Sequence, residues 1–249
     1  MTSEPVVLFE DNHCLAIAKP AGLLTQGVPA GLPTLEAWAR DVIRQRTGKT
    51  GNIYLGVPHR LDRPVSGVVL FARTSKAAAR LAEQFQTQQV EKCYWALVEG
   101  SVSAEGLWVD WLRKRPDESR VDAVPHDAAG AKRAESEVRV LGAAGTATWL
   151  ELRPRTGRTH QLRVQAAVRG HPILGDELYG STTHFGPPAE LRRDRVIALH
   201  ARSLSFLHPI RYDRVVLACD PPEYWPTPVR VGAGATETET RIETADGHG

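Results

Sequence analysis

The sequence predicts an α+β fold with a mixed, mainly antiparallel sheet in two halves, flanking helices and a central cleft. Apolar segments typical of strands outnumber helical segments, and many follow one another without a helix between them. The 249 residues contain no internal repeat, and 42% are hydrophobic, enough for a sizeable core. The chain is therefore expected to form one large domain or two small ones that share a cleft.

The first third of the chain predicts two strands, a helix, a loop and a buried strand. Residues 6–19 favour two short strands around a turn at Asp11 and Asn12. Residues 35–46 have helical spacing, with Thr34 as the cap. Prolines and glycines make residues 57–67 a rigid loop, and the apolar run that follows predicts a strand buried on both faces.

The remaining elements are mostly strands. Ser75 is expected to cap a helix that ends near Gln89, and residues 90–100 predict the next strand. A short helix is expected after the RTGRT turn, over residues 160–170. Further strands are predicted at residues 107–114, 135–142, 146–154, 196–206 and 213–220.

The last residues differ in composition from the rest. Residues 232–249 are rich in Thr, Glu and Gly, carry net negative charge and have no apolar period, which predicts a disordered acidic tail after a domain over residues 1–231. The chain shows no signal peptide and no apolar run of about 18 residues, so we expect a cytoplasmic protein that does not contact a membrane.

The sequence gives no sign of a metal or cofactor site. The three cysteines, Cys14, Cys93 and Cys219, are far apart in apolar runs, so buried, reduced thiols are expected. The histidines form no recognisable ligand set, and dinucleotide and P-loop motifs are missing from the sequence. We therefore predict no metal, no nucleotide cofactor and no cofactor of any other kind.

Asp62 is the first candidate for chemistry. It lies in the rigid loop between two prolines and is flanked by Arg60 and Arg63. Neighbouring cations favour the ionised form of a carboxylate, which a nucleophile or base requires. Taken alone, an aspartate in such a loop is more often a turn residue that accepts backbone hydrogen bonds.

A second candidate is the segment RTGRTHQLR, residues 155–163. Arg155, Arg158 and Arg163 surround a glycine turn that opens a helix, a combination that suits a phosphate or a carboxylate. Arg163, one turn into the helix, is placed to pair with a buried carboxylate. A surface capping loop is the alternative interpretation.

A strand tyrosine is the third candidate. Tyr94 is expected to face the same way as Lys92. Most strand tyrosines are core aromatics, but a tyrosine ring can also stack on a base that has been flipped out of an RNA helix.

Together these segments resemble one enzyme family. Residues 59–67, HRLDRPVSG, and the apolar strand after them are similar to the aspartate motif of RluA-like pseudouridine synthases. EKCYWALVEG resembles that family's K-x-Y strand, and RTGRTHQLRVQ its R-T-G-R-x-H-Q segment. FEDNHCLAIAKPAGLLTQG, HPILGDELYG and ALHARSLSF match other blocks, in the family's order, across about residues 6–226.

The resemblance implies the pseudouridine synthase fold with an RNA-binding cleft, and a role for each matched residue. Asp62 would be the essential carboxylate, Tyr94 the tyrosine against the target base, and Arg163 the partner that holds Asp62 through a forked pair. Arg60 would help displace the base. Arg60, Arg63, Arg155, Arg158, His160 and Gln161 are the predicted RNA-binding residues.

The implied protein is a cofactor-free isomerase of uridines in structured ribosomal or transfer RNA. A monomer is expected because nothing in the sequence suggests an obligate dimer. Gln165 stands where the family usually has His, and Val65 where Thr is common. Because only about five residues precede the first strand, the small RNA-binding domain that many relatives carry there is expected to be absent. A relative that binds or remodels RNA without turnover is the main alternative, and a hydrolase using Asp62 or a serine is another.

Overall fold

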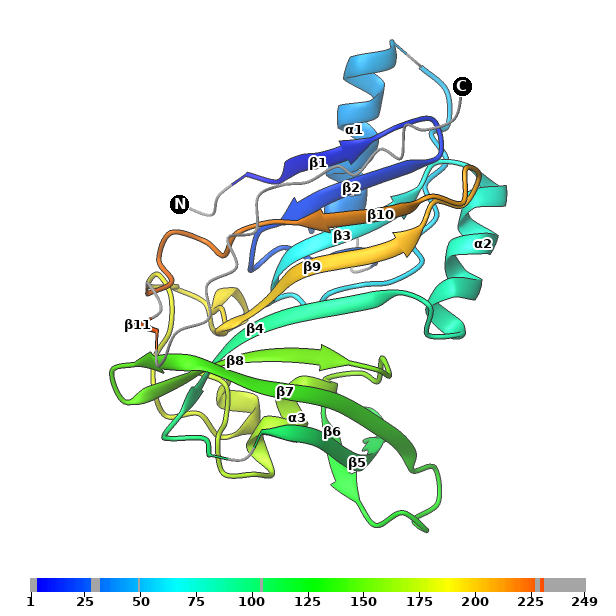
Figure 1. The fold of residues 1–249 in the computed structure, drawn as a ribbon. Helices are drawn as coiled ribbons and strands as arrows, with labels where there is room; N and C mark the ends of the chain where they lie inside the picture. The colour runs from blue at the N-terminus through cyan, green and yellow to red at the C-terminus, as the bar shows by residue number, and fades with distance from the viewer. Residues whose placement is uncertain (1–3, 28–31, 49, 104, 227–228, 231–249) are drawn as a thin grey trace.

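The computed structural model describes residues 4–27, 32–48, 50–103, 105–226 and 229–230. Their strands form one mixed sheet, drawn in Figure 1 as a continuous layer. The predicted acidic tail, residues 232–249, lies outside the described residues. The strands are β1 (Val6–Glu10), β2 (Cys14–Lys19), β3 (Ser66–Ala72), β4 (Glu91–Glu99), β5 (Gly106–Lys114), β6 (Val121–Val124), β7 (Lys132–Ala144), β8 (Ala147–Pro154), β9 (Leu199–Leu207), β10 (Arg214–Ala218) and β11 (Val229–Arg230).

The sheet has two halves that meet at its central strands. The strand order is β1-β2-β3-β9-β4-β8-β7-β5-β6, with β10 paired to β9 and β11 to β7. Among the described strands, β3 and β9 are the only parallel pair, and β9 joins the halves by pairing antiparallel with β4. The predicted α+β class with a mainly antiparallel sheet is confirmed.

The predicted hairpin and buried strand are both present. The carboxylate of Asp11 accepts hydrogen bonds from the backbone N–H groups of His13 and Cys14, at 2.8 and 2.7 Å, and so fixes the turn between β1 and β2. Every residue of β3 is buried, as expected for its uninterrupted apolar sequence.

The helices lie beside the sheet, with α1 and α2 next to the first half and α3 next to the second (Figure 1). They are α1 (Leu35–Thr47), α2 (Ser75–Gln86) and α3 (Gln161–Ala167), with single 3-10 turns at Glu177–Tyr179 and Arg192–Asp194. The cap of α1 is Thr34, as predicted. None of the helices in the described part of the chain is both long and apolar enough to cross a membrane.

The prediction that Ser75 caps α2 was wrong. The N-cap is Thr74, whose hydroxyl accepts the backbone N–H of Ala77 at 3.2 Å, and Ser75 is the first helical residue. Both residues are good caps by type, so the sequence alone does not separate them. The helix also ends three residues earlier than expected, at Gln86.

Two strands were not predicted. Residues 121–124 form β6, an edge strand paired with β5, and residues 229–230 form β11. Both are short, and β6 stands in a polar stretch without an extended apolar alternation. Their pairing is therefore decided by the neighbouring strand rather than by their own sequence.

A single core cluster extends across both halves of the sheet. It contains Leu15 and Ile17 of β2 together with Val138 of β7 and Leu152 of β8. Gly67 at the start of β3 has φ +121°, and a Cβ there would lie 2.3 Å from the carbonyl oxygen of Ala201. Glycine at this position thus allows β3 and β9 to approach at the loop that holds Asp62.

Candidate active site

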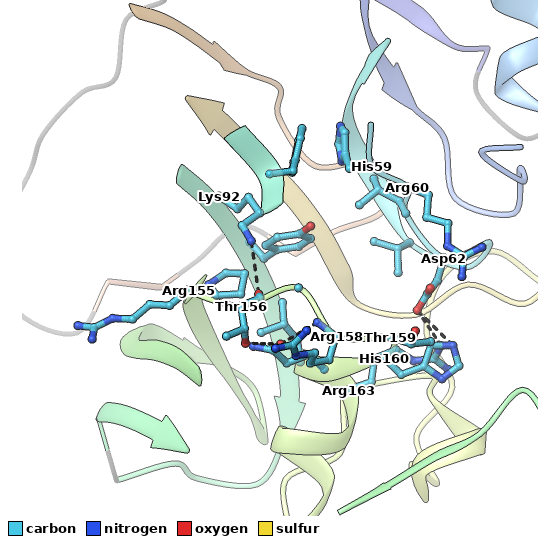
Figure 2. Close-up of a pocket in the computed structure, with 18 of the residues that line it drawn as sticks. His59, Arg60, Asp62, Lys92, Arg155, Thr156, Arg158, Thr159, His160 and Arg163 are labelled. Atoms are coloured by element: carbon cyan, nitrogen blue, oxygen red, sulfur yellow. Dashed lines mark hydrogen bonds and ion pairs between the residues drawn. The ribbon is translucent and has the colours of Figure 1, made fainter. Parts of the chain in front are cut away.

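A cavity of about 570 Å³ opens between the two halves of the sheet. Its walls come from the loop before β3, the C-terminal end of α2, strand β4 and the turn before α3. Among its lining residues Asp62 is the only carboxylate (Figure 2). The five Lys and Arg residues of the lining are Arg60, Lys92, Arg155, Arg158 and Arg163.

The loop that carries Asp62 is fixed by buried hydrogen bonds. The hydroxyl of Thr25 donates to the carbonyl of Leu61 at 2.9 Å and accepts its backbone N–H at 3.1 Å. The ammonium of Lys19 donates to the carbonyls of Leu23 and Arg63, at 2.7 and 3.3 Å, and burial lowers the pKa of Lys19 to about 7. These bonds fix the backbone of the loop, while the Asp62 side chain remains 28% exposed and open to the cavity.

Arg163 contacts Asp62 but forms its forked pair with another carboxylate. Its Nη1 lies 3.1 Å from Asp62 Oδ2, while Nε and Nη2 donate to the two oxygens of Asp176 at 2.7 and 2.8 Å. The expected forked pair between Arg163 and Asp62 is thus corrected to a single hydrogen bond. Burial opposes the positive charge of Arg163, but the bonds to Asp176 outweigh it and raise the pKa of Arg163.

Asp176 is the residue of this site that the sequence analysis missed. Its side chain is 1% exposed and lies in the segment HPILGDELYG, which was matched only as a family block. A signal was available, because an arginine inside an apolar helix needs a buried carboxylate partner. Nothing local indicated which carboxylate would provide it.

His160 approaches Asp62 from the same segment as Arg163. His160 has a left-handed backbone, φ 52°, and its Nε2 lies 3.5 Å from Asp62 Oδ2. Its Nδ1 lies 2.7 Å from the hydroxyl of Tyr179, which itself accepts the backbone N–H of Val121 at 3.0 Å. Burial lowers the pKa of His160, although Asp62 opposes the shift.

The groups beside its two ring nitrogens favour one tautomer of His160. An ionised Asp62 can only accept, so a proton on Nε2 suits the contact with Asp62 and leaves Nδ1 to accept from the Tyr179 hydroxyl. A neutral imidazole that accepts at Nδ1 carries its proton on Nε2. The network therefore assigns to His160 an N–H that faces Asp62.

Tyr94 and Lys92 both line the cavity, in agreement with the expectation that their side chains lie on the same face of the strand. The Tyr94 hydroxyl makes no hydrogen bond with any described residue, and burial, reinforced by the nearby Asp62 charge, raises the pKa of Tyr94. Tyr94 is therefore a neutral phenol at physiological pH. The ammonium of Lys92 lies 3.4 Å from the Thr156 carbonyl, and burial lowers the pKa of Lys92 to about 8.

The remaining arginines of the prediction differ in their surroundings. Arg60 is exposed and has no ion pair among the described residues. Arg63 donates to the Gly22 carbonyl and to Asp194, which ties it to the fold. Arg158 donates to the Arg133 carbonyl at 3.0 Å, and Arg155 pairs with Glu137 and points away from the cavity (Figure 2).

Gln161 and Gln165 are held entirely by protein groups. The amide of Gln161 accepts from Thr156 and Arg158 and donates to Glu135 and Ser136, so it shapes the turn before α3. Gln165, which is fully buried, accepts from Ser136 at 2.7 Å and donates to Asp110 at 2.9 Å. Glutamine satisfies this position with one acceptor and one donor, as a histidine would.

One group outside the cavity has metal-ligand residue types. Ligand atoms of Asp11, Cys14 and His208 lie within 4.8 Å of one another. Both oxygens of Asp11 already accept hydrogen bonds, and Arg211 donates to Oδ2 at 2.8 Å. Nδ1 of His208 accepts the backbone N–H of Arg211 at 3.0 Å. These bonds join the β1–β2 turn to the end of β9, and the guanidinium of Arg211 already provides the positive charge beside Asp11.

Proteins of one enzyme family are similar to this chain in sequence and in fold. A model of the RNA pseudouridylate synthase family matches residues 13–168. The chain is 34% identical to ribosomal large subunit pseudouridine synthase D of Zymomonas mobilis, over 87% of this chain and 69% of that protein. It is 36% identical to the dual-specificity RNA pseudouridine synthase RluA of Vibrio vulnificus, over 82% and 78%.

A solved structure agrees with this relationship. The human RNA pseudouridylate synthase domain-containing protein 4 superposes with a TM-score of 0.70 at 25% identity, over 88% of this chain and 89% of that one. The chain therefore belongs to the RNA pseudouridylate synthase family, whose members are isomerases that convert uridine in RNA to pseudouridine. The resemblance to RluA-like enzymes drawn from the sequence is confirmed.

Proposed function

We propose that this chain isomerises specific uridines in structured ribosomal or transfer RNA, with Asp62 as the essential carboxylate. The observation that carries the proposal is the position of Asp62, the single carboxylate among the residues lining a basic cavity, hydrogen-bonded to buried Arg163. The names of the relatives support RNA as the substrate, since they include ribosomal and dual-specificity enzymes.

The chemistry suits the residues present. Pseudouridine formation breaks the N1–C1′ bond, turns the uracil over and joins C5 to C1′, so no atom is gained or lost and no electron is transferred. An ionised Asp62 is required whether it attacks C1′ or removes the 2′ proton. Arg163 and the Nε2–H of His160 both contact Oδ2 and leave Oδ1 to face the ribose.

Tyr94 and Arg60 are assigned to the base. As a neutral phenol without a protein partner, Tyr94 offers its ring for stacking on the flipped uracil and its hydroxyl for a proton transfer at C5. Arg60 is exposed at the cavity mouth, where its guanidinium can fill the space that the flipped base leaves in the RNA.

The expected substrate is a loop or bulge. Flipping a base costs a few kcal/mol and least in a loop, and the cationic lining supplies salt-dependent affinity for the backbone. Such a substrate would place the protein in the cytoplasm. The catalytic unit is proposed to work as a monomer, and without a cofactor because the isomerisation transfers no electron and no group.

Tritium release from RNA labelled at uridine C5 tests the proposal. RNA from cells that lack this gene is incubated with wild-type protein, with Asp62→Asn and with Asp110→Asn as a control outside the cavity. We expect release by wild type and Asp110→Asn, and a loss of at least about 10³-fold in Asp62→Asn, the scale for removing a catalytic group. Turnover by Asp62→Asn at the wild-type rate would refute the role of Asp62. Absence of release by wild type would favour RNA binding without turnover.

A further inference from the structure

The cavity continues past Asp62 and Tyr94 to the C-terminal end of α2. This part, here called the α2-end subsite, is lined by His59, Phe85, Gln86, Gln88 and Lys92. The whole volume, about 570 Å³, lies in the range of about 300–1,000 Å³ of pockets that hold ligands larger than a single base. A flipped uracil against Tyr94 would therefore leave the α2-end subsite unfilled.

Lys92 is a cation without a counterion. It has no carboxylate within 4.0 Å among the described residues, and its one hydrogen bond, to the Thr156 carbonyl, is long at 3.4 Å. Its side chain is partly buried, and only the loss of water accounts for the lowered pKa of Lys92. An ammonium in these surroundings gains more from a phosphate oxygen than an exposed lysine does, because less water competes for it.

The rest of the α2-end subsite suits a base. The ring of Phe85 stacks on His59 at 4.6 Å between centroids, with an interplanar angle of 18°, and the pair forms one wall. His59 is held in place because its Nε2 accepts the backbone N–H of Leu70 at 2.9 Å. Gln86 and Gln88 are exposed at the rim, where their amides can donate to and accept from a base edge.

The spacing on β4 relates this subsite to the target uridine. Lys92 and Tyr94 are two residues apart on one strand and line one cavity, so their Cα atoms are separated by about 6.6 Å. That separation is within the span of one nucleotide. A phosphate at Lys92 would thus belong to a nucleotide next to the uridine that Tyr94 contacts.

We propose that the α2-end subsite binds the nucleotide adjacent to the target uridine, with Lys92 contacting its phosphate and Gln86 and Gln88 its base. This inference rests on the proposed function and deepens it, since it makes the enzyme selective for the sequence beside the uridine. It also assigns the C-terminal end of α2 to RNA recognition.

The first test measures binding in an inactive background, so that turnover does not enter. Asp62→Asn protein is compared with Asp62→Asn carrying Lys92→Met, using a fluorescent RNA hairpin with a uridine-containing loop. Loss of one phosphate contact should make the slope of log K against log salt shallower by about 0.7. Lys76→Met, which removes an exposed lysine at the start of α2 outside the cavity, is the matched control and should leave the slope unchanged.

Two further variants separate charge from folding. Lys92→Arg keeps the charge and should restore most of the slope, and thermal melting reports whether Lys92→Met remains folded. An unchanged slope in folded Lys92→Met, or an equal change in Lys76→Met, would overturn the proposal. Because every protein compared carries Asp62→Asn, these results are independent of whether the wild type isomerises uridine.

The second test locates the phosphate. Each loop linkage of the hairpin is replaced in turn by an uncharged methylphosphonate, and the effect on affinity is measured for Asp62→Asn protein with and without Lys92→Met. The linkage beside the bound uridine should weaken binding only when Lys92 is present. If the effect of Lys92→Met depended on a remote linkage, or on none, Lys92 would not contact the phosphate of the adjacent nucleotide.

The affinity should also depend on pH with a defined sign. A phosphate needs the charged ammonium, and Lys92 in the free protein loses its proton above about pH 8. Binding must therefore take up a proton at higher pH, and affinity should fall as the pH rises above about 8, more steeply with Lys92 than in Lys92→Met. Parallel pH profiles for the two proteins would contradict the contact.

Discussion

The Asp62 carboxylate receives two donors from one turn of the chain. Residues 160–163 place the imidazole of His160 and the guanidinium of Arg163 on the same oxygen, Oδ2, at 3.5 and 3.1 Å. Arg163 is in turn oriented by Asp176, and His160 by the hydroxyl of Tyr179. The carboxylate is thus oriented by groups that are themselves fixed, which is how a site keeps its geometry.

His160 can be tested as a positioning residue. Asn tolerates the left-handed backbone of this position but cannot place a donor where Nε2 lies, whereas Gln can. We expect His160→Asn to lower the single-turnover rate by about tenfold, equivalent to about 1.4 kcal/mol, and His160→Gln to lower it less. Nitrogen-15 NMR of the imidazole at pH 7 should show the Nε2–H tautomer in wild type. An Nδ1–H tautomer, or Asn as active as His, would contradict this role.

At the scale of the elements, two neighbouring residues at the start of α2 differ in what they contribute: the N-cap and the first helical residue. Thr74 accepts the Ala77 N–H, whereas Ser75 is exposed in the first turn. The helix supplies Phe85 to the cavity wall, and its first turn therefore matters for the α2-end subsite.

We predict that Thr74→Ala and Ser75→Ala differ in their effect on the free energy of unfolding. Thr74→Ala should lower the free energy of unfolding by about 1 kcal/mol, the usual cost of losing an N-cap. Ser75→Ala should change it by less than about 0.5 kcal/mol, as for a surface residue without a special role. Urea unfolding followed by circular dichroism measures both. Equal losses, or a larger loss for Ser75→Ala, would show that Thr74 is not the cap in solution.

The whole molecule is joined by its central strands and its shared core. β9 pairs with both β3 and β4, and one apolar cluster contains side chains from both halves of the sheet. The cavity lies at this junction, so its two walls keep their distance only while both halves are folded.

The shared core predicts that the halves unfold together. Fluorine-labelled tryptophans report on each half separately, with Trp38 in α1 and Trp111 in β5. Both signals should lose intensity at the same urea concentration. Leu152→Ala, at a fully buried position in β8, should shift both midpoints equally and cost about 2–5 kcal/mol. A lower midpoint for Trp111 alone would show that the second half is a separate folding unit.

Local patterns in the sequence determined most of the elements of this protein. The apolar run of β3, the spacing of α1 and the turn at Asp11 are each properties of a few consecutive residues, and all three are present in the structure. The motif around Asp62 and the strand with Tyr94 likewise indicated the family, because a family motif is itself a local pattern. The assigned roles of Asp62, Tyr94 and Arg163 remain predictions.

Only the tertiary structure decided which groups meet. Asp62 and Arg163 are 101 residues apart. Whether Arg163 forms its forked pair with Asp62 or with Asp176 depends on how the loop before β3, helix α3 and the segment after α3 come together. The tautomer of His160 similarly depends on Asp62 and Tyr179, which belong to different segments. Sequence patterns report the propensity and burial of single elements, while such contacts follow from how the elements pack. The physical reason is that a side chain's partner is chosen by proximity in space, and no periodicity along the chain encodes it.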